Sequence, residues 1–86
     1  MSRTENHTRN QPLEIDARGL NCPMPLLKAK QALGRVEVGG HVRLLASDPG
    51  SVKDFHSFTR LTRHTLVDFI EMDDHFVYLL QKGEPK

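Results

Sequence analysis

Two prolines at the head of an apolar run restrict this chain more than any other feature. Pro23 and Pro25 precede apolar residues with the three- and four-residue spacing of a helix, namely Leu26, Leu27, Ala29, Leu33 and Val36. Proline is tolerated in the first turn of a helix, where its missing N–H has no intrahelical partner. The sequence therefore predicts a helix from about residue 23 to 34 or 36, with Cys22 as its N-cap.

Four other segments alternate apolar and polar residues with the period of a β-strand. They cover residues 13–17, 41–46, 66–71 and 75–81, and residues 72–74 form a hairpin turn between the last two. Between the second and third segments, Asp48 and Pro49 form a typical helix start, with the aspartate as N-cap and the proline as first helical residue. We expect the helix that follows to end near His64.

The predicted order is β-α-β-α-β-β, which indicates an α/β protein. Right-handed β-α-β crossovers would place both helices on one face of a four-stranded mixed sheet, giving a two-layer α/β sandwich. A chain of 86 residues has room for one domain. We expect residues 1–12 to be a disordered N-terminal tail, residues 13–82 the single domain, and residues 83–86 a C-terminal tail.

Size and composition exclude several classes of function. So short a chain cannot enclose a deep cavity with several catalytic walls, which argues against a self-contained metabolic enzyme. The net charge is +1, so no overall field drives binding to nucleic acids or membranes. The chain has no apolar stretch of the ~20 residues that a membrane span needs, and no apolar run typical of a secretory signal. Its single cysteine fits a reducing compartment, so we expect a cytoplasmic protein without a membrane partner.

Cys22 is the residue with distinctive chemistry. The thiolate is the nucleophilic form, and the positive end of a helix favours it. We expect a modestly lowered pKa for Cys22, because the two prolines remove backbone donors while the dipole remains. Arg18 and Gly19, in the connection before Cys22, are candidates for supporting the site, Arg18 through its positive charge.

The residues around Cys22 favour presentation of its sulfur to another protein. Pro23, Met24 and Pro25 shape and stiffen the turn, so the sulfur lies at an exposed corner that a partner's sulfur can approach. With no second cysteine in the chain, a persulfide on Cys22 cannot collapse into an internal disulfide and must wait for an external acceptor. The alternative is that Cys22 is a small buried apolar residue, the common role of a lone cysteine.

The run DARGLNCPMP, residues 16–25, resembles the start of the TusA/SirA family of sulfur carriers, whose hallmark is Cys-Pro-x-Pro after a D-x-x-G-L-x stretch. Asp48-Pro49, Asp54 and residues 58–66 are similar to that family's second helix and its exit. The resemblance covers residues 13–82. Some family members have another cysteine where Thr59 stands here, so this chain lacks any two-cysteine chemistry.

The resemblance implies a sulfurtransferase-type carrier in which Cys22 accepts sulfane sulfur as a persulfide. The donor would be a cysteine desulfurase or a rhodanese-type protein. The sulfur would go to an acceptor protein, for example in tRNA 2-thiouridine synthesis, molybdenum-cofactor assembly or sulfur oxidation. The resemblance implies no cofactor and no metal, and it gives Pro23 and Pro25 a shaping role.

Two other functions stay open from the sequence. The first is a nucleic-acid-binding module, because the fold resembles the C-terminal domain of translation initiation factor three and the helices carry basic residues. The near-neutral charge and scarcity of aromatic residues weigh against it. The second is a thiol-based regulatory module that uses the same cysteine. A metal site is not expected, because the spacing of the five histidines matches no standard ligand pattern. Asp16, Asp54 and Asp68 are interpreted as caps and solvated positions.

Overall fold

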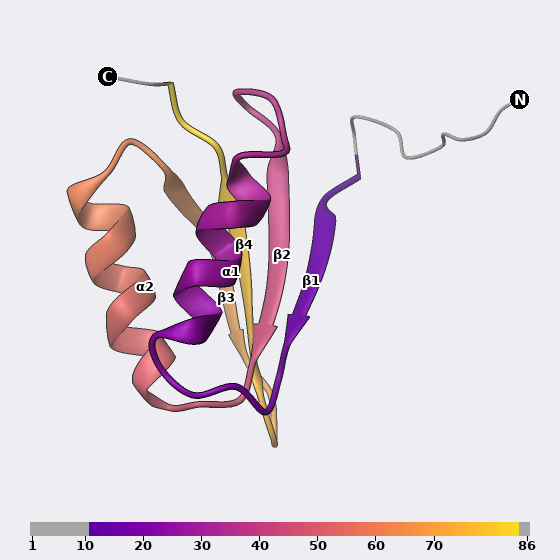
Figure 1. Cartoon of the computed structure of the whole chain (residues 1–86), viewed down its shortest axis with the longest axis vertical. Helices are drawn as coiled ribbons and strands as arrows, with labels where there is room; N and C mark the ends of the chain where they lie inside the picture. The colour runs from indigo at the N-terminus through magenta and orange to yellow at the C-terminus, as the bar shows by residue number, and fades with distance from the viewer. Residues whose placement is uncertain (1–10, 85–86) are drawn as a thin grey trace, which may run out of the picture.

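The computed structural model describes residues 11–84 and confirms the predicted order of strands and helices (Figure 1). Its elements are β1 (Leu13–Ala17), α1 (Met24–Leu33), β2 (His41–Ala46), α2 (Gly50–Leu61), β3 (Thr65–Glu71) and β4 (Phe76–Gln81). Most of the predicted N-terminal tail and the last two residues of the predicted C-terminal tail lie outside the described residues.

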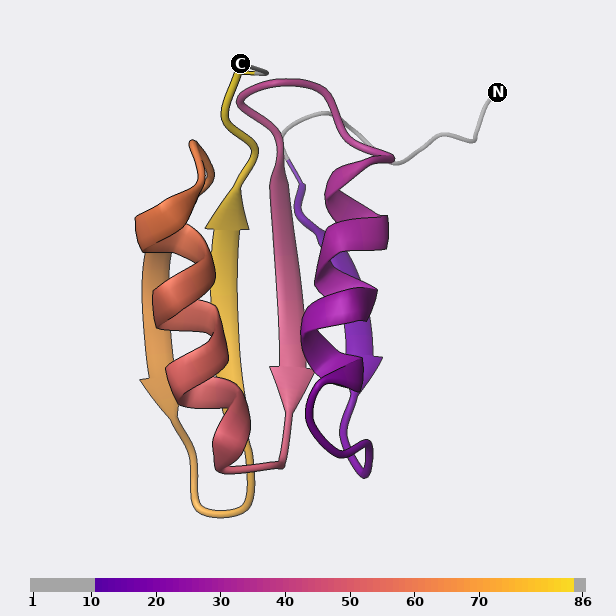
Figure 2. The same cartoon turned by 60° about the vertical axis from the view of Figure 1, so that its left-hand side comes forward.

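The four strands form one mixed sheet in the order β1-β2-β4-β3. β1 and β2 are parallel because α1 crosses over between them, whereas β4 is antiparallel to both of its neighbours. Figure 2 shows both helices in front of the same face of the sheet, so the two-layer α/β architecture is confirmed. Within residues 11–84, neither helix has the length and apolar character that crossing a membrane requires.

The core lies between the helices and the sheet. Alternate strand residues point into it, as the burial of Val42, Leu44 and Ala46 in β2 shows. The largest buried pair is Phe55 and Tyr78, whose rings stack with centroids 4.1 Å apart. The Tyr78 hydroxyl shares a buried hydrogen bond of 2.8 Å with the Ser51 hydroxyl, so neither polar group is left unpaired.

The start of α1 differs from the prediction. Pro23 is the N-cap residue and α1 begins at Met24, so Cys22 lies one residue further from the helix than expected. The cause is a turn before the helix, which the Met24 N–H closes by donating to the Asn21 carbonyl at 2.8 Å. Cys22 therefore occupies a turn and cannot cap the helix.

The bounds of α2 and of the last two strands also differ from the prediction. Pro49 is the N-cap of α2, and no side chain caps it, because the Asp48 carboxylate is bonded elsewhere. The helix ends at Leu61, well before His64, since Thr62 is extended at φ −124°. β3 begins one residue earlier than predicted and β4 one residue later.

The parallel pair determines where the functional side chains gather. β1 and β2 end at the same edge of the sheet, so the connections to α1 and α2 leave from that edge together (Figure 1). The turn between β3 and β4 lies at this end as well (Figure 2). We call it the Cys22 end, because Cys22 is in the first of these connections.

Candidate functional site

Cys22 is an exposed free thiol in the connection between β1 and α1. The turn that contains it is held on its helical side by the first bond of α1, in which the Leu27 N–H donates to the Pro23 carbonyl at 3.1 Å. Pro25 is fully buried beneath this turn, whereas Pro23 is exposed. Cys22 is thus followed by an exposed proline and, three positions on, by a buried one.

Side chains from the second connection tie the two loops together. The Asp48 carboxylate accepts a hydrogen bond of 2.7 Å from the Cys22 backbone N–H. The Ser47 hydroxyl accepts one of 2.8 Å from the Gly19 N–H. Gly19 has φ +86°, a conformation that glycine adopts without strain. Gly19, through its backbone, and Cys22 thus both bond to the β2–α2 loop.

The thiol itself points at α2. Cys22 Sγ donates a hydrogen bond of 2.6 Å to Asp54 Oδ2, across 32 positions of the sequence. Asp54 lies one turn into α2 and is half-buried. Its interpretation as a cap or solvated position missed this contact. The available signal was the parallel strand pair, which brings the start of α2 to the same edge as Cys22.

The expectation of a lowered pKa for Cys22 is also wrong. The hydrogen bond to Asp54 is the main cause of a raised pKa of this thiol, followed by desolvation and by the negative charges of Asp54 and Asp48. A thiolate beside two carboxylates is disfavoured by like-charge repulsion. The unloaded site therefore holds a protonated thiol.

Arg18 does not counter these charges. Its guanidinium makes a bidentate pair with Asp16, with Nε–Oδ1 and Nη2–Oδ2 distances of 2.9 and 2.8 Å. The pair lowers the pKa of Asp16 to about 2 and raises that of Arg18. The positive charge that we expected to act on Cys22 is thus directed at Asp16.

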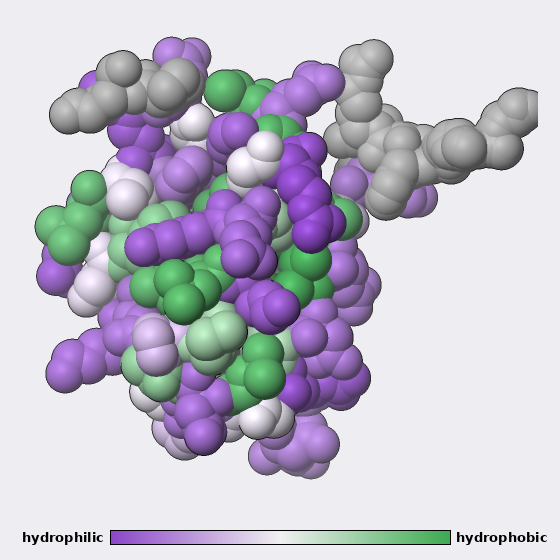
Figure 3. All heavy atoms as spheres, viewed as in Figure 1, coloured by the Kyte–Doolittle hydropathy of each residue, from purple (hydrophilic) through white to green (hydrophobic). Residues whose placement is uncertain are grey.

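Apolar side chains are exposed next to the thiol. Met24 is 42% exposed and Leu27 is 41% exposed, both on the first turn and a half of α1. Figure 3 shows apolar side chains interspersed with polar ones on the helical face of the molecule. Met24 is thus an exposed apolar side chain as well as a member of the Cys22 turn.

No group of three or more metal-ligating side chains occurs among residues 11–84. His7 lies outside the described residues. His64 Nδ1 accepts a hydrogen bond of 3.1 Å from the Gly83 N–H, and desolvation lowers the pKa of His64. The ring is therefore neutral and does not act as a cation at the end of α2.

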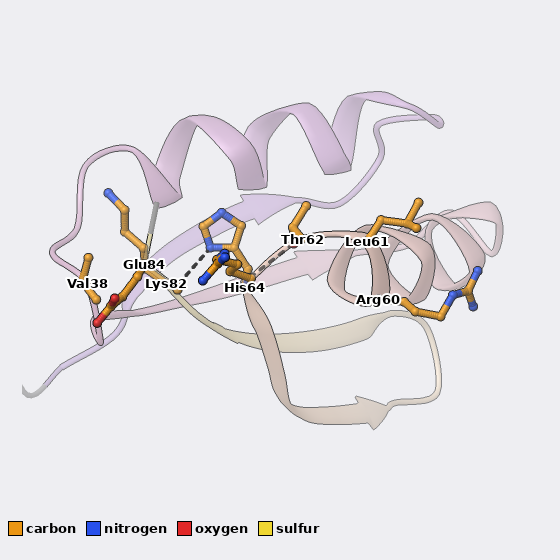
Figure 4. A pocket seen from close by; sticks show the side chains of 9 residues that line it. Val38, Arg60, Leu61, Thr62, His64, Lys82 and Glu84 are labelled. Atoms are coloured by element: carbon orange, nitrogen blue, oxygen red, sulfur yellow. Dashed lines mark hydrogen bonds between the residues drawn. The ribbon is translucent and has the colours of Figure 1, made fainter. Parts of the chain in front are cut away.

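An open hollow surrounds His64 at the end of the molecule opposite Cys22 (Figure 4). Figure 4 shows Lys82 and Glu84 on one side of His64 and Thr62 and Leu61 on the other, with the Arg60 side chain extending away. The Lys82 ammonium donates to the Val36 carbonyl at 2.9 Å, so this cation is already engaged in the fold.

Sequence comparison identifies a family with a matching profile. The family described as sulfurtransferase TusA matches residues 13–82. The sulfur carrier protein TusA of Allochromatium vinosum is 44% identical over 70 residues, which cover 81% of this chain and 92% of that protein. The sulfur carrier protein TusA of Pseudomonas fluorescens is 32% identical over 80 residues, which cover 91% of this chain and 96% of that protein.

Structural comparison agrees with the sequence. The crystal structure of a SirA-like protein from Desulfitobacterium hafniense superposes with a TM-score of 0.72 at 28% identity. The match covers 84% of this chain and 99% of that one. The resemblance that the Cys-Pro-Met-Pro motif suggested therefore extends to the whole described domain.

Proposed function

The chain belongs to the TusA family of sulfur-carrier proteins, and on that premise we propose that Cys22 is the residue that carries the sulfur. The observation that supports this proposal is an exposed cysteine in a proline-stiffened turn, with no second cysteine in the chain. The family assignment also favours a sulfur carrier over the nucleic-acid-binding module left open by the sequence.

The transfer that we propose needs only the Cys22 thiol and a donor persulfide. Cys22 Sγ forms a bond to the donor's outer sulfur as the donor's S–S bond breaks. The donor cysteine leaves as a thiolate and takes up the proton that Sγ has lost. The products are Cys22 persulfide and a donor thiol, and no external oxidant or reductant is consumed. The second transfer is the same reaction, with Cys22 persulfide as the sulfur donor and the acceptor protein as the recipient.

The surface beside Cys22 suits such an exchange. Transfer between two proteins requires an unobstructed approach of one sulfur to another along the axis of the breaking bond. Cys22 is exposed, and the apolar side chains of Met24 and Leu27 next to it can pack against a partner. We propose that the donor is a cysteine desulfurase or a rhodanese-type protein. The acceptor is a protein of tRNA 2-thiouridine synthesis, molybdenum-cofactor assembly or sulfur oxidation.

The test is sulfur loading followed by intact-mass measurement. After incubation with a cysteine desulfurase and free cysteine, the wild-type chain should gain the mass of one sulfur atom, and Cys22→Ser should gain none. The control is Cys22→Ser/Thr65→Cys, which moves the single thiol to an exposed position on β3. Loading of this control to the wild-type level would show that any exposed thiol suffices and would contradict a site at Cys22.

A further inference from the structure

Whether the Cys22–Asp54 hydrogen bond can form depends on whether the carrier is loaded. In the unloaded chain, the Sγ proton is donated to Asp54 Oδ2 over 2.6 Å. In a persulfide, Sγ is bonded to Cβ and to the outer sulfur and has no hydrogen, so it cannot donate to any acceptor. The contact seen in the structure therefore belongs to the unloaded carrier alone.

We propose that Asp54 is a positioning residue that holds the empty Cys22 thiol against α2 and releases it when the sulfur is loaded. This inference rests on the proposed function of Cys22 and adds a role that the family assignment does not give. In the loaded carrier, the outer sulfur bears negative charge once it loses its proton, and the Asp54 carboxylate repels it. The sulfur then points to solvent, where an acceptor protein can reach it.

The charges around Cys22 act in the same direction. Asp54 from α2 and Asp48 from the β2–α2 connection are the charged groups that act on the thiol within the described residues. Arg18, from the β1–α1 connection, is paired with Asp16, and the buried Tyr78 hydroxyl of β4 shares its hydrogen bond with Ser51. Among residues 11–84, therefore, carboxylates and no cation act on a sulfur close to α2.

The arrangement also protects the empty carrier. Oxidants attack the thiolate and not the thiol, so a thiol kept protonated by a carboxylate reacts slowly with them. The empty carrier thus stays unoxidised and available for loading. Its thiol reacts with the donor's persulfide when the two proteins are docked. Release of the contact accompanies formation of the new S–S bond, because the proton that made the contact has left.

The first experiment measures how fast iodoacetamide alkylates Cys22 between pH 6 and pH 10, in wild type and in Asp54→Asn. Asparagine has the same shape but no charge. We expect the alkylation rate at pH 7 to rise on the order of tenfold and the midpoint of the pH profile to fall, because a charged hydrogen-bond acceptor and a like charge are both removed. The charge-matched control is Asp73→Asn in the β3–β4 turn, which should follow wild type. Equal profiles for Asp54→Asn and wild type would overturn the proposal.

The second experiment uses the wild-type chain and needs no sulfur donor. Methyl methanethiosulfonate converts Cys22 to a methyl disulfide, whose Sγ also has no hydrogen. The carboxyl carbon resonance of Asp54 should move on this modification, while that of Asp68 on β3 should not. An unmoved Asp54 resonance would overturn the proposal even if Asp54→Asn folds poorly. Since neither experiment involves sulfur transfer, a failed loading experiment would contradict the proposed function without affecting these outcomes.

Discussion

The two ends of the sheet are held together by different kinds of interaction. At the Cys22 end, side-chain oxygens of Ser47, Asp48 and Asp54 bind groups of another loop. At the opposite end, backbone bonds join the loop before β2 to the chain after β4: the Gly39 N–H donates to the Lys82 carbonyl, and the Lys82 N–H donates to the Gly40 carbonyl. Side chains of Gln81, Lys82 and His64 add hydrogen bonds to backbone groups there. Paired backbone groups thus contribute at the opposite end, whereas side-chain oxygens accept the bonds that reach the Cys22 loop from the second connection and from α2.

The two ends also differ in charge. The Cys22 end carries most of its charge as carboxylates, on Asp16, Asp48, Asp54, Asp73 and Asp74, whereas the hollow at the other end is lined by three cations, Arg60, Arg63 and Lys82, and one carboxylate, Glu84. A net charge of +1 hides this separation. The comparison suggests that stability and thiol reactivity can be changed separately, by substitutions at one end or the other.

The largest effect on stability is expected at Gly83. A side chain on Gly83 would collide with the backbone carbonyl of Arg63, which cannot move as a flexible side chain would. We expect Gly83→Ala to lower the free energy of unfolding by about 2 kcal/mol, within the range for overpacked positions. Thermal melting would measure the loss, and the alkylation rate of Cys22 should stay at the wild-type value.

A suitable control for this substitution is Gly34→Ala. Its added carbon would lie 3.3 Å from the Gln31 carbonyl, so only a small adjustment is needed. Gly34 has φ −70°, which alanine adopts freely. If Gly83→Ala changed the alkylation rate of Cys22 as well as the melting temperature, the two ends would be coupled and the comparison would fail.

Asp48 is the residue at which both properties should change. Asp48→Ala removes the acceptor of the Cys22 backbone N–H, and we expect a loss of about 1.5 kcal/mol, the lower end of the range for a charged hydrogen bond. It also removes a charge that raises the pKa of Cys22, so alkylation at neutral pH should become faster. Because Asp48 makes the smallest contribution to the raised pKa of Cys22, the increase in alkylation rate should be smaller than in Asp54→Asn.

The matched control here is Asp73→Ala, which removes the same charge from an exposed turn at the same end. It should leave melting and alkylation near wild type. An Asp48→Ala variant that melted like this control would show that the bond to Cys22 contributes nothing to holding the two loops together.

The order of elements followed from the sequence because each segment shows one period clearly. Leu13, Ile15 and Ala17 alternate, and the apolar residues after Pro25 recur at helical spacing. Helix ends were less predictable, because they depend on hydrogen bonds made by the adjoining loops. Cys22 was placed as an N-cap from local propensity, but the Asn21–Met24 turn competes with that cap. Asp48 was assigned to cap α2 and instead bonds to Cys22, a contact between separate loops.

The position of Cys22 could be predicted, but its electrostatic environment could not. The helix dipole and Arg18 are close to Cys22 in the sequence, so they dominated the expectation of a lowered pKa. Asp54 is 32 positions away and reaches the thiol only because β1 and β2 are parallel neighbours. Arg18 bonds instead to Asp16, two residues earlier in the chain, and so does not act on Cys22. Long-range contacts of this kind depend on packing, which periodicity alone does not specify.

The smallest predicted effect is a pH dependence at the opposite end, where His64 is an uncharged acceptor. His64→Leu keeps apolar contact with Phe58 but loses the bond from the Gly83 N–H, which should cost about 1 kcal/mol at pH 8. Desolvation, with Lys82 nearby, lowers the pKa of His64 in the folded chain below the value of about 6.5 in the unfolded chain. The contribution of His64 is thus fully present above about pH 6.5 and is lost as the pH falls through the folded-state pKa, since the unfolded chain takes up the proton first.

The melting temperatures of wild type and His64→Leu should therefore converge between pH 8 and pH 5. The control is Thr62→Ala at the same end of α2, which removes hydrogen bonds to the Phe58 carbonyl and from the His64 backbone N–H but no ionisable group. The melting temperature of Thr62→Ala should differ from that of wild type by the same amount at every pH in this range. A His64→Leu difference that widened on acidification would mean that the folded chain binds the proton more tightly than the unfolded one. The lowered pKa and the uncharged state assigned to His64 would then be wrong.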